Sequence, residues 1–219
     1  GLWDQTVQTG TPPYDLEYGS AYTQEEIDQA LEQEDPYSLI PSRDEIGHGT
    51  ALAGIAAGTA IAENDFNGAA PQAMIAAVKL KPAKEYLKTL FYVTGDAPAY
   101  QMTDIMAGIR YLLRLSEELV RPLVICLGLG TSQGDHSGDS PLDSMLSITN
   151  QFRGFIGVTA AGNEAGRAHH YYGTALNSTE YNTVEILVKE GTRGFCAELW
   201  GQPPEVYAVG FESPLGEVV

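Results

Sequence analysis

Helical and strand-like apolar segments alternate three times between residues 48 and 161, and this alternation constrains the fold more than any other feature of the sequence. The strand-like segments are short and apolar, at 73–80, 123–127 and 155–161. Segments with helical spacing or small residues precede them, at 48–60, 104–119 and 141–152. Strands without polar alternation are typical of a parallel sheet covered on both faces. The sequence therefore predicts an α/β fold, with a central parallel sheet, helices on both faces and right-handed crossovers.

The two ends of the chain differ from this alternating part. Residues 1–45 carry eleven acidic residues and one basic residue, which predicts a solvated acidic face with a strand near 3–7 and a short helix near 23–34. Residues 181–219 contain three strand-like segments with no helix between them, at 184–189, 195–200 and 205–209. Such segments predict antiparallel pairing. We therefore expect a part organised by alternating helices and strands over 1–180 and a part with antiparallel strands over 181–219.

Composition limits the classes of partner. The chain has 219 residues, is 43% hydrophobic and carries a net charge of −17. It can bury one sizeable core, and its charge would repel nucleic acid and anionic membrane surfaces, so neither is an expected partner. No run approaches the roughly 18 apolar residues of a membrane helix. Cys126 and Cys196 form no disulfide framework and are predicted to be buried free thiols.

His48 is the first candidate for chemistry. It stands between Gly47 and Gly49 and opens the small-residue run 50–58. The glycines leave room for another backbone or a substrate to approach the imidazole. The positive end of the helix dipole disfavours an imidazolium, which keeps the ring able to accept a proton near neutral pH. The alternative is a histidine that merely begins a helix.

Two further candidates follow predicted strands, where ligands of parallel sheets bind. Gly128-Leu129-Gly130 comes after the strand 123–127 and leaves backbone groups open to pair with an extended peptide; a tight turn is the alternative. Asn163 follows the strand 155–161 between glycines, so that its amide could donate to a developing oxyanion. A turn asparagine in left-handed geometry is the alternative there.

These motifs together resemble the subtilisin-like serine endopeptidases of the S8 family. His48-Gly49-Thr50 with its small-residue helix resembles the family's histidine motif, and Ala77-Val78-Lys79-Leu80 the strand that follows it. Gly128-Leu129-Gly130 resembles the substrate-pairing strand, and Ala160-Ala161-Gly162-Asn163-Glu164 the oxyanion motif. The motifs stand in family order over about 44–166. The stretches Trp3-Asp4-Gln5-Thr6 and 40–45 resemble more specifically the clostridial branch that includes spore-germination proteases.

The resemblance implies that His48 is the general base, that Asn163 is the oxyanion donor, and that Gly128, Leu129 and Gly130 bind a peptide or protein substrate. It also implies a β-sandwich inserted in that branch, whose first strands the residues 181–219 resemble. Cut strand edges of such a sandwich favour homodimerisation or aggregation. No cofactor or metal is implied; relatives often carry calcium, but no segment here spells a specific calcium site. The family is commonly secreted or spore-associated, although this chain shows no signal peptide, and its compartment is not predicted.

Two members of the family's catalytic triad have no counterpart in the sequence. Neither Asp4 nor Asp44 stands in the family's Asp-Ser/Thr-Gly turn, and the serine motif would lie downstream of Asn163. The sequence therefore predicts an internal piece of a subtilase that is inert by itself. One alternative is a pseudoprotease that binds peptides or partners through the same cleft. A less favoured one is an α/β-hydrolase with Ser132 as nucleophile and His169 or His170 as base, which would need a helix directly after the serine.

Overall fold

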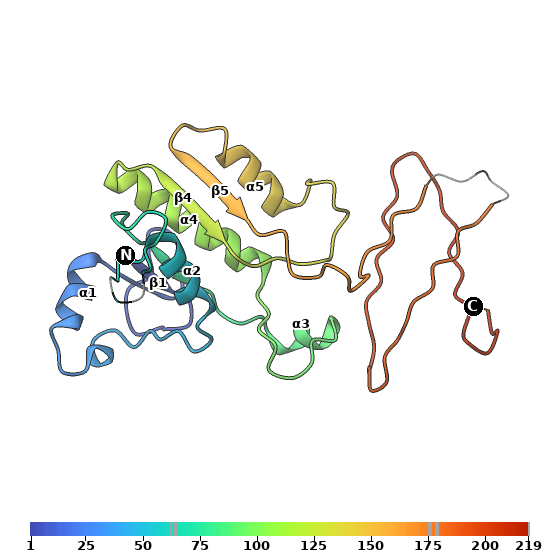
Figure 1. The fold of residues 1–219 in the computed structure, drawn as a ribbon, viewed down its shortest axis with the longest axis horizontal. Coiled ribbons are helices and arrows are strands. Elements are labelled where there is room, and N and C mark those ends of the chain that lie inside the picture. The colour runs from blue at the N-terminus through green and yellow to red at the C-terminus, as the bar shows by residue number, and fades with distance from the viewer. Residues whose placement is uncertain (62, 64, 175–176, 178–179, 219) are drawn as a thin grey trace.

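The fold was analysed in a computed structural model, which describes residues 1–61, 63, 65–174, 177 and 180–218. Figure 1 shows the helices and strands gathered in one half of the molecule, with the residues beyond about 165 running as long extended loops beside them. No helix among the described residues is long and apolar enough to cross a bilayer.

The first sheet has three short strands in the order β2-β1-β3. Strand β1 (Leu2–Asp4) pairs antiparallel with β2 (Ser20–Tyr22) and parallel with β3 (Ala77–Lys79). Trp3 anchors this sheet. Its indole is completely buried, lies against the rings of Tyr18 and Tyr111 at centroid distances of 5.3 and 5.6 Å, and donates to the Tyr18 carbonyl oxygen at 3.2 Å.

The second sheet consists of two parallel strands, β4 (Leu123–Leu127) and β5 (Phe155–Thr159), paired in register along their whole length. Two helices pack against it, α4 (Met102–Leu119) and α5 (Pro141–Thr149). The β4 bounds agree with those that the apolar run predicts. Ser140 caps α5 with proline at the first helical position, as the sequence indicates.

Helix α4 connects the two sheets through the core. Its residues Ile105 and Ile109 form the buried cluster with Ile125 of β4. On the side of the first sheet, a Cβ placed on Gly108 would lie 3.2 Å from Val78 Cγ1 in β3, so α4 packs closely there too. Because one amphipathic helix contacts β3 and β4, the strand ends of both sheets are fixed relative to each other.

The remaining helices are short. Helix α1 (Gln24–Leu31) begins with the predicted capping box, in which Thr23 and Glu26 bond to each other's backbone N–H groups. A short 3₁₀ helix, η1 (Pro36–Ser38), leads toward α2 (His48–Ala57), and α3 (Glu85–Leu90) follows β3. Helix α2 begins at the residue that the glycine-bracketed motif indicates.

Two details differ from the sequence-based prediction. The described strands form two sheets rather than one: β3 does not pair with β4, and no other described strand lies between them to join the sheets. One face of the second sheet is also open: alternate residues of β4 and β5 are exposed on it, namely Val124, Cys126, Ile156 and Val158. Cys196 is exposed as well. The prediction of two buried thiols is therefore wrong, since an apolar sequence does not guarantee a covering layer within the described chain.

The tail also differs from expectation. Residues 184–189, 195–200 and 205–209 are all described, yet none is assigned as a strand, and the tail's one antiparallel pairing in 180–218 is an isolated bridge between Glu212 and Val218. Short strands need several partners and an apolar surface to pack against before they are stable. Within residues 180–218 the three segments have neither strand partners nor an apolar surface to pack against. The division of the chain near residue 180 stays a prediction.

Candidate active site

His48 lies at the end of β4. Helix α2 begins with this residue, and its Nε2 lies 2.9 Å from the carbonyl oxygen of Gly128, the first residue after the strand. The structure thus brings together two motifs that are 80 residues apart in the sequence. The imidazole is exposed at the carboxyl ends of the strands, where parallel sheets bind their ligands.

Two glycines lie beside His48, and the backbone conformation of the first favours glycine. Gly47, the residue before α2, has φ 83°, a left-handed conformation that favours glycine. At Gly128 a Cβ would lie 2.2 Å from Leu52 Cδ1 of α2 and 3.5 Å from His48 Nε2. Leu52 Cδ1 ends a flexible side chain, so a larger residue at position 128 would displace Leu52 and lie against the His48 ring. Gly130, in contrast, faces open space.

Asn163 follows the neighbouring strand. Because β4 and β5 are in register up to Leu127 and Thr159, the segments that leave the two strands start side by side. Ala160 N–H donates to the Leu127 carbonyl at 3.4 Å, and Gly162 at φ 92° turns the chain just before Asn163. The Asn163 side chain is exposed and bonds to no described residue. The structure therefore joins His48 to Gly128, while Asn163 stands free in the adjacent loop.

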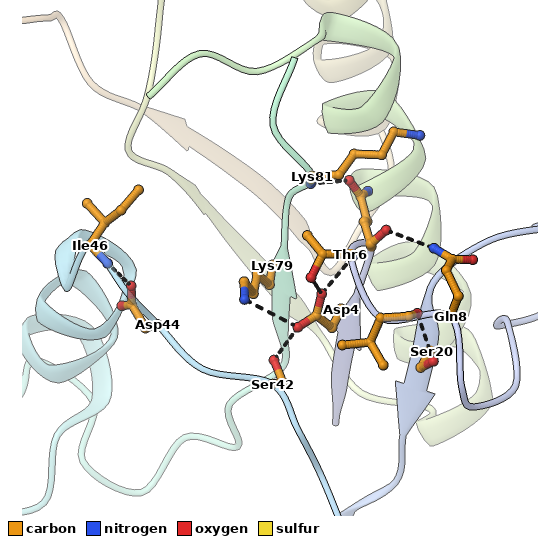
Figure 2. A network of polar contacts seen from close by, with 11 residues as sticks. Asp4, Thr6, Gln8, Ser20, Ser42, Asp44, Ile46, Lys79 and Lys81 are labelled. Carbon is orange, nitrogen blue, oxygen red and sulfur yellow. Dashed lines mark hydrogen bonds and ion pairs between the residues drawn. The ribbon is translucent and has the colours of Figure 1, made fainter. Parts of the chain in front are cut away.

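Asp4 connects the segment that precedes α2 to the first sheet. Figure 2 shows its fully buried carboxylate at the end of β1, where it accepts from Ser42 Oγ at 2.5 Å and from the N–H and hydroxyl of Thr6 at 2.7 and 2.6 Å. Lys79 Nζ of β3 lies 3.6 Å away. Burial alone raises the pKa of Asp4, but the hydrogen bonds and the Lys79 charge outweigh it and place the pKa below its ordinary value of 3.8.

Asp44 holds the start of α2. Its carboxylate accepts hydrogen bonds from the hydroxyl and N–H of Thr50 and from the N–H groups of Gly47 and Ile46, and these bonds lower its pKa far below the ordinary value. Sequence reasoning considered Asp44 only as a triad candidate. The sequence signal for its capping role is an aspartate three residues before Gly47, the residue that precedes the helix and has no side chain to cap it.

Acid is expected to protonate Asp4 and Asp44 and so to weaken the hydrogen bonds that their carboxylates accept. Because the pKa values of Asp4 and Asp44 are lowered by folding, the unfolded chain takes up these protons first, and the stability they supply above about pH 4 is lost as the pH falls further. Urea denaturation of the chain at pH 6, 4.5 and 3, followed by circular dichroism, should show a falling free energy of unfolding at the acid end.

Protonation of the other acidic residues also changes the stability, because it reduces the repulsion within a chain of net charge −17. A variant of Asp4 separates the contribution of this residue from theirs. Asp4→Asn cannot titrate, so its free energy of unfolding should be lower at pH 6 and should fall less than that of the wild type between pH 4.5 and 3. Equal pH slopes for the two proteins would contradict the assignment to Asp4.

Ser132 does not lie in a nucleophile elbow. Residues 131–140 are all described and form a loop, and α5 begins only at Pro141, whereas the elbow requires a helix immediately after the serine. Within the same loop, Ser137 Oγ donates to both Asp135 and Asp139. Among the described residues, no three histidine, cysteine or acidic side chains gather as metal ligands.

Comparisons with known proteins identify the family of the chain. The model of the subtilase family, peptidase family S8, matches residues 1–188. Among solved structures, the chain is similar to the CspB protease of Clostridium perfringens, with 31% sequence identity and a TM-score of 0.62 over 77% of this chain and 31% of that one. The chain thus spans about a third of that protein's length. Comparison with curated proteins returned no match. The match over most of the chain confirms the resemblance carried by its motifs, and the chain belongs to the subtilase family of subtilisin-like serine proteases.

Proposed function

We propose that this chain supplies the general base, the oxyanion donor and the substrate-binding edge of a serine endopeptidase. The observation that carries the proposal is the 2.9 Å contact between His48 Nε2 and the Gly128 carbonyl, which sets the imidazole beside the end of β4. A peptide that pairs with the backbone of 128–130 would pass within reach of the ring. Asn163, from the loop after β5, would donate its amide to the developing oxyanion.

The protonation of His48 explains why the chain alone should be inert. A carbonyl oxygen only accepts, so Nε2 carries the proton in the contact with Gly128. A general base for a serine hydroxyl needs the opposite tautomer, with the proton on Nδ1 held by an acid and Nε2 free. Asp4 and Asp44 do not bond to the ring, since the oxygens of each bond elsewhere in the described chain.

We infer that the orienting acid and the nucleophilic serine belong to segments outside these 219 residues. The acid would draw the proton to Nδ1, which frees Nε2 from the Gly128 carbonyl and makes it available to the serine hydroxyl. The serine would then attack the peptide carbonyl, and His48 would pass the proton to the leaving amine. The activity is therefore expected of the longer protein and not of residues 1–219 alone.

Asn163→Ala in the longer protein tests the oxyanion assignment. We expect kcat for a peptide substrate to fall by about 10² to 10³-fold with little change in KM, because the amide contacts the oxygen only when it becomes charged. That magnitude comes from a subtilisin. Steady-state kinetics on a chromogenic peptide provide the measurement.

The matched control is Asn182→Ala, the same substitution at an exposed asparagine of the tail. It should leave kcat and KM unchanged. A loss confined to KM, or equal effects of the two substitutions, would show that Asn163 is a turn residue and not a donor to the reacting oxygen.

A further inference from the structure

We propose that Asp44 is a positioning residue for His48: by binding the first turn of α2, its carboxylate fixes the imidazole against the end of β4. The proposal rests on the proposed function in that His48 acts as the base. Asp44 itself touches no reacting atom, and its effect passes through the backbone of α2.

The contacts of Asp44 span the histidine on both sides. One carboxylate oxygen accepts from the N–H groups of Ile46 and Gly47, at 3.1 and 2.8 Å. The other accepts from the N–H and the hydroxyl of Thr50, at 3.0 and 2.6 Å. Figure 2 shows Asp44 at the start of α2 with its bond to Ile46. The carboxylate thus binds the chain at Gly47, just before His48, and at Thr50, just after it. A shift of the His48 Cα would therefore strain or break these charge-assisted hydrogen bonds.

Helix α2 has few other means of holding its first turn in place. Its residue before the helix, Gly47, has no side chain to cap the free N–H groups, and none of the helix residues is buried. Its last turn is held separately, by backbone bonds from Ala69 and Ala70 to the carbonyls of Ile55 and Ala56. At the start of the helix, Asp44 supplies the capping that Gly47 cannot, and its negative charge suits the positive end of the helix.

The segment before Asp44 is itself fixed to the sheet. Ser42 donates to the buried Asp4 carboxylate at the end of β1, two residues upstream of Asp44. Two carboxylates therefore hold the chain between the first sheet and His48. Asp4 of β1 binds the loop at Ser42, and Asp44 binds the first turn of α2. A misplacement of about 1 Å at a catalytic group can cost about 10²-fold in rate, so loosening the second anchor should affect catalysis.

The neighbouring Glu45 offers a matched control. It is exposed, carries the same charge, and makes no hydrogen bond or ion pair to any described residue. Asp44→Ala and Glu45→Ala therefore remove the same charge one residue apart, and only the first removes the contacts to α2. Asp44→Asn keeps one acceptor oxygen and Thr50→Val removes only the hydroxyl contact, so both should have smaller effects than Asp44→Ala.

The first measurement is made on the longer protein, well below its melting temperature, with a peptide substrate. We expect kcat of Asp44→Ala to fall about 10 to 100-fold with KM changed less than twofold, Asp44→Asn to lie in between, and Glu45→Ala to match the wild type. A general loss of structure would lower the far-UV circular dichroism signal of the variants together with kcat, whereas a loss of positioning lowers kcat alone. Equal kcat in Asp44→Ala and Glu45→Ala would overturn the proposal.

The second measurement does not depend on activity. Imidazole ¹⁵N shifts of His48 in the 219-residue chain should report the Nε2-protonated tautomer in the wild type and in Glu45→Ala, and an average of both tautomers in Asp44→Ala. If the longer protein hydrolyses no peptide, the proposed function fails, while these shifts still decide the positioning role. If Asp44→Ala does not fold, Asp44→Asn and Thr50→Val carry the same comparison, and wild-type shifts in both would overturn the proposal.

Discussion

Replacing His48 by alanine in the longer protein will lower kcat for peptide hydrolysis by roughly 10⁶-fold, the magnitude expected when the base of a serine triad is removed. The physical reason is that the serine hydroxyl is a weak nucleophile until a positioned imidazole takes its proton. His48 is the residue that the structure sets against Gly128 at the end of β4. Steady-state and burst kinetics with an ester or peptide substrate would measure the loss.

Two comparisons make this result decisive. His169→Ala removes an exposed histidine whose Nδ1 pairs with Glu164 at 3.2 Å, and it should leave kcat unchanged. Residues 1–219 alone should show no hydrolysis that a serine-directed inhibitor abolishes. Peptide binding by the longer protein without any hydrolysis would favour the pseudoprotease alternative. Inhibitor-sensitive hydrolysis by the 219-residue chain would mean that the acid and the serine lie within it.

Replacing Trp3 by alanine will lower the free energy of unfolding of the chain by about 3 to 5 kcal/mol, the usual cost of truncating a fully buried aromatic residue. Trp3 has no exposed surface, lies against Tyr18 and Tyr111, and leaves no room at Gly19, where a Cβ would be 2.4 Å from Trp3 Nε1. Its neighbour Asp4 would lose its orientation toward Ser42 in the same step. Urea denaturation followed by far-UV circular dichroism is the measurement.

The other tryptophan of the chain is the control. Trp200 is 59% exposed in the tail and bonds to Glu198, so Trp200→Ala should change the free energy of unfolding by less than about 0.5 kcal/mol. If both substitutions shift the denaturation midpoint equally, the burial of Trp3 does not anchor the first sheet. If Trp3→Ala is too unstable to purify, Trp3→Phe should still lower the midpoint while Trp200→Phe should not.

The local elements were predictable because each has its cause within a few residues. The bounds of β4 follow from an apolar run that ends at Pro122 and Gly128, and the start of α5 follows from Ser140 and Pro141. The capping box at Thr23 likewise needs only its own four residues. The sequence-based predictions were wrong where an element depends on a partner strand or a covering layer from elsewhere in the chain. The tail segments have strand-like composition but lack a sheet to join in the described chain, and Cys126 sits in an apolar strand whose outer face stays open.

The candidate site shows the same division. The sequence by itself determined the chemistry: an imidazole bracketed by glycines, an amide after an apolar strand, and the family to which both belong, because residue types and their spacing are local information. Only the tertiary structure decided the placement. The contacts of Asp44 with α2 are local, but only the structure shows that this carboxylate serves the helix rather than the imidazole. That His48 donates to Gly128, and that Leu52 of α2 lies beside Gly128, depend on how segments about 80 residues apart pack together. Such contacts are set by the packing of α2 against the end of β4, which no single stretch of sequence encodes.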